Sequence, residues 1–360
     1  MRKIIRKIIS KKNGVIPMSD YTPPYKITDK ALMLVADISE KVGRITQRSE
    51  LDAKPHLRKN NKIKSIHSSL AIEANSLTLG EVRDVIDGKL VLGAAREIQE
   101  VKNAYAAYEE VGSVDIYSIK ELKRLHGIMT KYLTEGSGEF RCGEEGVFSG
   151  DRCIFMAPPA KLVPGQMEEL FAWLKRSRNT VHPLILAAVF HYEFVFIHPF
   201  TDGNGRMARL WHTAILTKWQ PIFEFISIES QIEKFQNGYY DAIAKCHIEG
   251  SSTAFIEFML ERIDAILDEA AENLTAPRSN VSEYVGRLLS VMEYDIPYSA
   301  KELLALLGLK SRDTLRVNYL VPAVKDGFVV MTEPDKPNSR NQRYKKLYGG
   351  AVGGESGKKD

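Results

Sequence analysis

A break between two helices near the middle of the chain most constrains how this sequence can fold. The stretch from Leu184 to Ile197 is almost continuously apolar and predicts a helix. Pro199 stops this helix from simply continuing, because proline lacks an N–H donor and clashes with the preceding turn. Gly203-Asn-Gly205 then supplies the backbone freedom for a tight turn, after which an amphipathic helix begins. The sequence therefore predicts two helices joined by a short, glycine-rich loop.

This loop carries the residue types that phosphate chemistry needs. A glycine-rich turn at a helix N-terminus favours an anion, because its N–H groups are unpaired and the helix dipole is positive there. Arg206 and Arg209 lie three positions apart on the next turn and could bind further phosphates. Asp202 offers a hard oxygen ligand for Mg²⁺, and His198 is the group able to accept a proton near neutral pH. The loop is therefore typical of phosphoryl-type transfer to a hydroxyl.

The residues from His198 to Arg209 read HPFTDGNGRMAR. They resemble, without a departure, the HPFx[D/E]GNGRxxR signature of the Fic family, and the order of helices and hairpin is similar over residues 26–274. The resemblance implies a mainly α fold, a Fic-type helical bundle with a small β-hairpin flap. It also implies AMPylation, the transfer of AMP from ATP to a Ser, Thr or Tyr hydroxyl of a target protein. Relatives that act as kinases carry Lys at the position of Gly205, which argues against a kinase here.

The resemblance also implies roles for individual residues. His198 would be the catalytic base and Asp202 the ligand of Mg²⁺. The α-phosphate of ATP would bind to Asn204 and the amides of Gly203 and Gly205, and the outer phosphates to Arg206 and Arg209.

A paired tyrosine, Tyr239-Tyr240, is similar to the stretch that lines the adenine pocket in relatives. Two adjacent residues of a helix point in different directions, so one of them would be a core residue. His247 stands where many relatives have Asn, which leaves the adenine contacts open.

Two short apolar runs around a Ser-Gly-Asp turn predict a β-hairpin from Gly146 to Met156. Considered alone, this pattern indicates only a surface hairpin. By resemblance, residues 147–156 are the flap that holds the target protein by β-strand addition.

Ser69 and Glu73 lie four positions apart on a predicted helix, a spacing that by itself is typical of a capped surface helix. Beside the Fic signature, it resembles the [S/T]xxxE[G/N] motif of an N-terminal inhibitory helix, here near residues 62–75, with Ala74 departing from the pattern. The resemblance implies that a buried Glu73 forms a bidentate pair with Arg209 and occupies the γ-phosphate position. Whether Glu73 also supports removal of AMP stays open.

The remaining segments divide the chain further. Residues 1–25 predict a basic arm, either a membrane-surface helix or an extension before a translation start at Met18. Residues 26–275 would form the Fic domain, and residues 348–360 a disordered tail. Between them, residues 276–347 predict a linker and a unit that resembles a winged helix, with helices at 298–308 and 311–325 and strands at 327–331 and 342–346. Its partner would be DNA, through the second helix and a basic wing, or a protein, including a second copy in a homodimer.

Composition sets wider limits. A net charge of +4 is too small to imply a polyanion partner for the whole chain, and no apolar run reaches the roughly 18 residues that span a membrane. Three widely spaced cysteines predict neither a disulfide framework nor a zinc site and favour the cytoplasm. Two other functions remain: a DNA-binding regulator with a nucleotide-sensing Fic-like domain, and transfer of another group such as UMP or phosphocholine.

Overall fold

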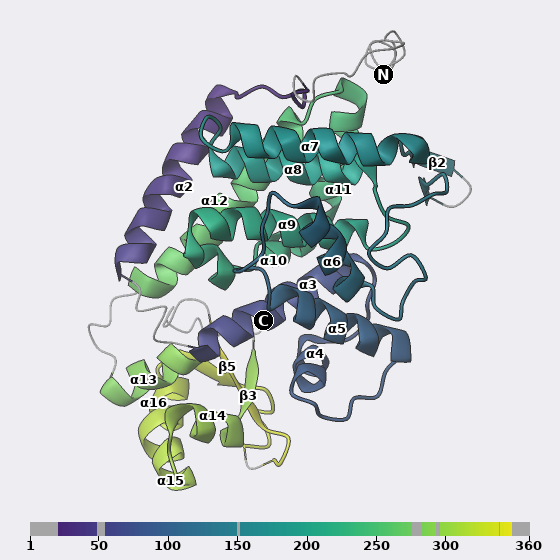
Figure 1. Ribbon diagram of the computed structural model, residues 1–360. Coiled ribbons are helices and arrows are strands. Elements are labelled where there is room, and N and C mark those ends of the chain that lie inside the picture. Colours follow the sequence, from purple (N-terminus) through teal and green to yellow (C-terminus); the bar gives the residue numbers. More distant parts are fainter. Residues whose placement is uncertain are drawn as a thin grey trace, which may run out of the picture. The chain divides into compact units, whose positions relative to one another are not determined.

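The computed structural model describes residues 21–48, 55–149, 152–275, 282–292, 296–337 and 339–347 (Figure 1). The basic segment before Tyr21 and the tail at 348–360 lie outside the described residues. The chain divides into two compact units, residues 1–47 with 62–270 and residues 48–61 with 271–360. The second unit thus combines residues from 271 onward with residues 48–61, and the latter assignment was not predicted.

The first unit is almost entirely helical, as the mainly α fold class predicts (Figure 1). Its helices are α2 (Asp29–Arg48), α3 (Pro55–Ile72, shared with the second unit), α4 (Leu79–Ile86), α5 (Ala95–Tyr108), α6 (Ile119–Met129), α7 (Val163–Ser177), α8 (Pro183–Ile197), α9 (Asn204–Trp219), α10 (Ile228–Lys234), α11 (Gln236–Glu249) and α12 (Thr253–Thr275), with short 3-10 turns at Ala160–Leu162 and Pro221–Phe225. The predicted hairpin is formed by antiparallel strands β1 (Gly146–Ser149) and β2 (Arg152–Met156).

Helix α8 is the centre of this unit. Its residues from Leu184 to Phe194 are all buried, which explains why the sequence is apolar on every side of the helix rather than along one stripe. Phe190 packs edge-on against Phe171 of α7 and stacks with Trp211 of α9, with ring centroids 5.3 and 6.2 Å apart. Each such aromatic side chain stabilises the fold by about 1.5–3 kcal/mol through burial. The loop between α8 and α9 is thus anchored at both ends in the densest part of the core.

The N-terminal edge of the described chain packs on the same unit. The Tyr21 hydroxyl donates to Glu193 of α8 at 2.9 Å, and the ring of Tyr25 meets Trp173 of α7 edge-on. Residues 21–25 therefore belong to the packed unit, which differs from the arm expected over residues 1–25. Further on, Lys41 of α2 pairs with Asp264 of α12 at 2.7 Å, consistent with the parallel course of these helices in Figure 1.

The second unit has its own core and a small sheet. Its elements are α13 (Glu283–Val291), β3 (Pro297–Ser299), α14 (Ala300–Leu307), α15 (Arg312–Thr314), a π-helical turn (Leu315–Leu320), α16 (Val321–Lys325), β4 (Val329–Met331) and β5 (Arg343–Lys346). The antiparallel sheet has the order β3-β5-β4. Three helical segments followed by a hairpin are compatible with the expected winged helix.

Local chemistry explains how the helices of this unit begin and end. Ser299 and Glu302 form a capping box at the start of α14, and Gly308 ends the helix with a left-handed φ of 66°. The expected helix at 311–325 is continuous but contains the π-helical turn, because Pro322 has no N–H to donate to the carbonyl one turn earlier.

None of the described helices combines the length and the continuous apolar character that crossing a lipid bilayer requires.

Candidate active site

The loop from His198 to Gly203 has two residues in the left-handed backbone region, one at each end. His198 caps the end of α8 with φ 51°, and its N–H donates to the carbonyl of Phe194 at 3.0 Å. Gly203 caps the start of α9 with φ 82°. A Cβ atom at Gly203 would lie 2.9 Å from Cγ2 of Thr130, so both the backbone angle and the available space require glycine. A non-glycine residue with positive φ, such as His198, is a strained conformation of the kind found at functional sites.

The loop is closed from inside by the side chain of Asn204. Its Oδ1 accepts from the N–H of Phe200 at 2.9 Å, and its Nδ2 donates to the carbonyl of Phe200 at 2.6 Å. The Phe200 ring is fully buried and stacks on His126 at 3.6 Å. Asn204 therefore shapes the loop, and the backbone N–H groups of the first turn of α9 are the part that faces an anion.

Arg141 supports the loop from the other side, although no sequence motif marks it. This buried guanidinium donates from Nε to the carbonyl of His198 at 2.7 Å, while the Arg141 N–H donates to the carbonyl of Pro199 at 2.9 Å. It also bonds the carbonyls of Gly143 and Pro158, which flank the hairpin. One arginine thus ties the base of the hairpin to the loop between α8 and α9. In the sequence, Arg141 differs from the other arginines only in its position between two irregular segments.

The His198 ring is suited to act as a base. Burial lowers the pKa of this imidazole below its usual value, and the positive charge of Arg141 lowers it further. The carbonyl of Val195 and the carboxylate of Glu73 act in the opposite direction without reversing the shift. His198 is therefore neutral at physiological pH and has a nitrogen lone pair available for a proton.

Arg206 is a buried cation with unused donors. Its Nη2 donates to Oδ1 of Asp202 at 2.9 Å. Its Nε and Nη1 have no hydrogen-bond partner within the described parts of the chain, although Nη1 lies 4.0 Å from a carboxylate oxygen of Glu100. Because an unsatisfied buried donor is costly, these N–H groups fit an anionic ligand such as a phosphate.

Asp202 is ionised and faces several donors. Burial raises the pKa of this carboxyl. Arg206, the Gly203 N–H and Arg96 lower it by more, so the pKa of Asp202 is below its usual value. No group of three or more His, Cys, Asp or Glu side chains that could hold a metal occurs among the residues that the structure describes. The ionised Asp202 carboxylate is the kind of single protein ligand that nucleotide sites offer to Mg²⁺, where phosphate and water supply the other ligands.

Arg209 lies one turn further along α9 and contacts the end of α3. Its Nε donates to Oγ of Ser69 at 3.0 Å, and its Nη2 donates to the Ser69 carbonyl at 2.9 Å and to Oε1 of Glu73 at 2.8 Å. Ser69, Glu73 and Arg209 are therefore brought together as expected. Two details were wrong: the Glu73 side chain is 39% exposed rather than buried, and the contact is through one oxygen rather than bidentate.

The position of Glu73 follows from the way α3 ends. The helix stops at Ile72, and Ala74 turns the chain with a left-handed φ of 66°. The Glu73 carboxylate lies where a Cβ atom of Gly205 would be, so the glycine makes room for it. The Glu73 carboxylate thus lies against Gly205 in the first turn of α9 and contacts Arg209.

The two tyrosines of α11 are placed differently. Tyr239 is buried, and its hydroxyl bonds Nε2 of His191 at 2.9 Å. Tyr240 is exposed. His247 stacks on Phe155 of strand β2 with ring centroids 4.1 Å apart, so α11 and the hairpin share an aromatic contact.

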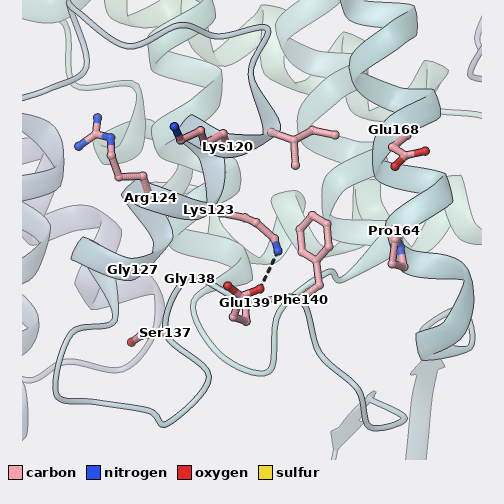
Figure 2. Close-up of a pocket in the computed structure, with 11 residues that line it drawn as sticks. Lys120, Lys123, Arg124, Gly127, Ser137, Gly138, Glu139, Phe140, Pro164 and Glu168 are labelled. Atoms are coloured by element: carbon pink, nitrogen blue, oxygen red, sulfur yellow. Dashed lines mark hydrogen bonds and ion pairs between the residues drawn. The ribbon is translucent and has the colours of Figure 1, made fainter.

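A cavity of about 820 Å³ lies between α6, the loop before the hairpin and the start of α7 (Figure 2). Figure 2 shows Lys123 and Glu139 paired across it, at 2.7 Å, with Phe140 beside them. None of the residues expected at the active site lines this cavity, but Phe140 in its wall packs on Phe200 at 5.4 Å. The cavity is therefore a neighbour of the loop at 198–203 and does not include the residues expected at the active site.

Comparisons with known proteins place the loop at 198–209 within a matched family region. Residues 116–216 match the Fic/DOC family, and residues 283–346 match the domain described as "Filamentation induced by cAMP protein Fic-like, C-terminal domain". Among curated proteins, the protein adenylyltransferase fic-1 of Caenorhabditis elegans is 28% identical over 242 residues, which are 61% of this chain and 46% of that protein. The protein adenylyltransferase Fic of Drosophila melanogaster is 30% identical over 219 residues, 56% of this chain and 41% of that protein. The chain thus spans less than half the length of these relatives.

Solved structures extend the likeness to most of the chain. A Fic domain containing signaling protein from Bacteroides thetaiotaomicron has a TM-score of 0.57 at 20% identity, covering 69% of this chain and 98% of that one, and shows the fold alone. A Fic family protein from Desulfovibrio desulfuricans G20 is 42% identical, with a TM-score of 0.67, over 92% of this chain and all of that one. With the complete loop from His198 to Arg209, this similarity shows that the chain belongs to the Fic family.

Proposed function

We propose that the protein is an adenylyltransferase that moves AMP from ATP to a hydroxyl of a target protein. The observation that carries the proposal is the loop at 198–209, where a neutral imidazole, an ionised carboxylate and a buried arginine with unused donors surround a helix N-terminus. The names of the curated relatives support the same activity.

Each residue of the site would carry out one part of the reaction. His198 takes the proton of the target hydroxyl, whose oxygen forms a bond to the α-phosphorus as the bond to the bridging oxygen breaks and pyrophosphate leaves. The first-turn N–H groups of α9 orient the α-phosphate, and Arg206 and Arg209 stabilise the negative charge on the leaving pyrophosphate. Mg²⁺, held by Asp202, would neutralise part of that charge when bound.

We further propose that the described conformation is the inhibited one. Glu73 occupies a donor of Arg209 and places a negative charge over the first turn of α9, where the outer phosphates would bind. A nucleotide that enters beside it is held in a pose unsuitable for transfer, because like charges repel. Tyr240 and the hairpin at 147–156 remain our candidates for contact with adenine and with the target protein.

The experiment is a labelling assay of the full chain with Mg²⁺ and each of α-³²P-labelled ATP, GTP, CTP and UTP. We expect weak self-labelling from ATP by the parent and at least ten-fold more by Glu73→Gly, with none by Glu73→Gly/His198→Ala. Stronger labelling from GTP, CTP or UTP would show that the protein transfers GMP, CMP or UMP rather than AMP. Equal labelling by Glu73→Gly and the parent would refute the inhibited state. Loss of bound label after ATP is removed, only when Glu73 is present, would indicate removal of AMP.

For the second unit we infer a protein-docking role. Two basic residues of the expected wing are used internally: Arg343 lies 3.5 Å from Glu302, and Nζ of Lys346 donates to the carbonyl of Leu289 at 2.9 Å. Such engaged cations contribute less to DNA binding, which depends on phosphate contacts. Gel-shift titration with random duplex DNA tests this: tight, salt-dependent binding would favour the DNA-binding regulator.

The free thiols of Cys142 and Cys246 support a reducing, cytoplasmic setting.

A further inference from the structure

The two carboxylate oxygens of Asp202 have different surroundings. Oδ1 accepts from the N–H of Gly203 at 2.6 Å and from Nη2 of Arg206 at 2.9 Å. Within the described ranges of the chain, Oδ2 accepts from a single donor, Nη2 of Arg96, at 3.2 Å. Since Oδ1 is engaged by two donors of its own loop and helix, Oδ2 is the oxygen that a divalent cation would use. That oxygen is the one that Arg96 covers.

Arg96 comes from another part of the chain and lies outside the signature. It is in the first turn of α5, 106 positions before Asp202. Its side chain is 60% exposed and that of Asp202 is 35% exposed, so the contact is at the open side of the site. Exposed ion pairs of this kind contribute little, because water screens them and two side chains must be ordered to make them. The Arg96 guanidinium can therefore leave Asp202 at small cost.

A second carboxylate is in place to receive it. Oε1 of Glu100, four residues further along α5, lies 3.4 Å from Nε of Arg96. Glu100 is largely buried and makes a hydrogen bond with Asn75 at 2.9 Å, so its position is set independently of Arg96. When Arg96 gives up Oδ2, its charge remains paired with Glu100.

We propose that Arg96 is a positioning residue that competes with the divalent cation for Oδ2 of Asp202, and that it thereby sets how strongly nucleotide binding depends on the metal. The proposal rests on the proposed function, because it takes Asp202 as the metal ligand. In the metal-free site Arg96 neutralises Asp202 and attracts the nucleotide phosphates. With metal present, the same positive charge opposes the cation, since both need the one oxygen.

These opposite effects define a measurable ratio, the Kd of ATP in EDTA divided by the Kd of ATP in Mg²⁺. Arg96→Gln removes an attraction for ATP when the metal is absent and removes a competitor when it is present. Both changes raise the ratio. For an exposed pair we expect an increase of about two- to five-fold in the ratio, and Arg96→Lys, which keeps the charge, should stay closer to the parent.

The experiment is calorimetric titration of ATP into the full chain carrying Glu73→Gly and His198→Ala, which frees the site and prevents turnover. Arg44→Gln is the matched control, because Arg44 is 59% exposed and pairs with Glu40 at i,i+4, as Arg96 does with Glu100. Asp202→Asn is the second reference and should bring the ratio close to one.

The outcomes separate the two proposals. A raised ratio for Arg96→Gln, with no change for Arg44→Gln, supports the competition. If Asp202→Asn abolishes the metal dependence while Arg96→Gln leaves or lowers the ratio, Arg96 does not compete and the inference is overturned, although the metal site stands. If Asp202→Asn leaves the ratio unchanged, Asp202 is not the metal ligand, and both the metal assignment of the proposed function and the competition fail.

Discussion

The proposed role of His198 as a base depends on the surroundings of its ring as much as on its identity. Burial is the largest cause of its lowered pKa, so the neutral form that accepts a proton persists below the usual titration range of histidine. We predict that the rate of self-labelling by Glu73→Gly is constant above pH 6.5 and falls only at lower pH. Initial rates at saturating ATP from pH 5 to 8 measure this. An apparent pKa above 6.5 would mean that the ring is not the buried base described above.

We expect Ser69 to contribute to the proposed inhibited state separately from Glu73. Its hydroxyl accepts from Nε of Arg209, and both residues are buried. Removing the hydroxyl leaves a buried donor unsatisfied, at a cost of about 1–3 kcal/mol. We predict that Ser69→Ala raises self-labelling several-fold, by less than Glu73→Gly.

The control for this prediction is Ser68→Ala. Ser68 is equally buried and adjacent on α3, but no hydrogen bond joins it to Arg209 in the described structure. Equal activation by the two substitutions would show that loosening α3, rather than freeing Arg209, is what matters.

Residue-level prediction from sequence succeeded where a motif carries the information. Glu73, Ser69 and Arg209 meet as expected, since two separate motifs are complementary in charge. The single contact and partial exposure of Glu73 depend on the left-handed turn at Ala74, which propensities do not predict. Arg96 gave no signal at all, because an isolated arginine 106 residues from its partner resembles any solvated charge.

At the scale of elements, the loop between α8 and α9 is constrained by one glycine. At Gly203 a side chain would adopt an unfavourable positive φ and also overlap with Thr130. We predict that Gly203→Ala lowers the free energy of unfolding by about 2 kcal/mol, from roughly 1–2 kcal/mol for the backbone angle plus the overlap. Urea denaturation measures it.

Gly165 of α7 offers the matched substitution. It has no atom within 4 Å of an added Cβ and an ordinary helical backbone. Gly165→Ala should therefore leave stability unchanged or raise it by up to about 1 kcal/mol. A loss at Gly165 as large as that at Gly203 would contradict the steric explanation.

Helices with strong periodicity and clear ends were predictable, and α8, α9 and the hairpin lie where the sequence indicates. The division between α10 and α11, at the single residue Phe235, was not predictable in this way. There the guanidinium of Arg262 lies 4.1 Å from the centre of the Phe235 ring. This contact joins α12 to the end of α10. The hydrophobic periodicity of α10 and α11 therefore does not indicate that the helix ends at Phe235.

At the scale of the whole molecule, buried histidines determine how the fold responds to acid. The pKa values of His212 and His247 are lowered to about 4 by burial, against about 6.5 in an unfolded chain. The unfolded state therefore binds more protons between these values, and stability falls as pH decreases from 6.5 to 4. The fully buried His212 contributes a slope of about 1.4 kcal/mol per pH unit in that window, and the half-buried His247 contributes less because water screens it.

We predict that the midpoint of urea denaturation decreases steeply between pH 6.5 and 4 and less steeply below. His247→Asn should reduce the slope, because Asn does not titrate. A midpoint that is flat across this window would show that these rings are protonated in the folded protein.

The division into two units was only partly predictable. Composition and the linker-like segment near residue 276 indicate the second unit, but residues 48–61 join it from the other end of the chain. Within that unit, Nδ2 of Asn60 donates to the hydroxyl of Tyr298 at 3.0 Å, an interaction across 238 positions. Pairings of such separation depend on the folded chain and leave no local pattern.

The central claim is that the loop at 198–209 forms a complete transfer site that Glu73 keeps inactive. The most direct measurement compares ³²P incorporation from α-labelled and γ-labelled ATP by the parent, Glu73→Gly and Glu73→Gly/His198→Ala. The account predicts label from the α-phosphate only, at least ten-fold more for Glu73→Gly, and none when His198 is replaced. Label from the γ-phosphate, or full activity without His198, would contradict it.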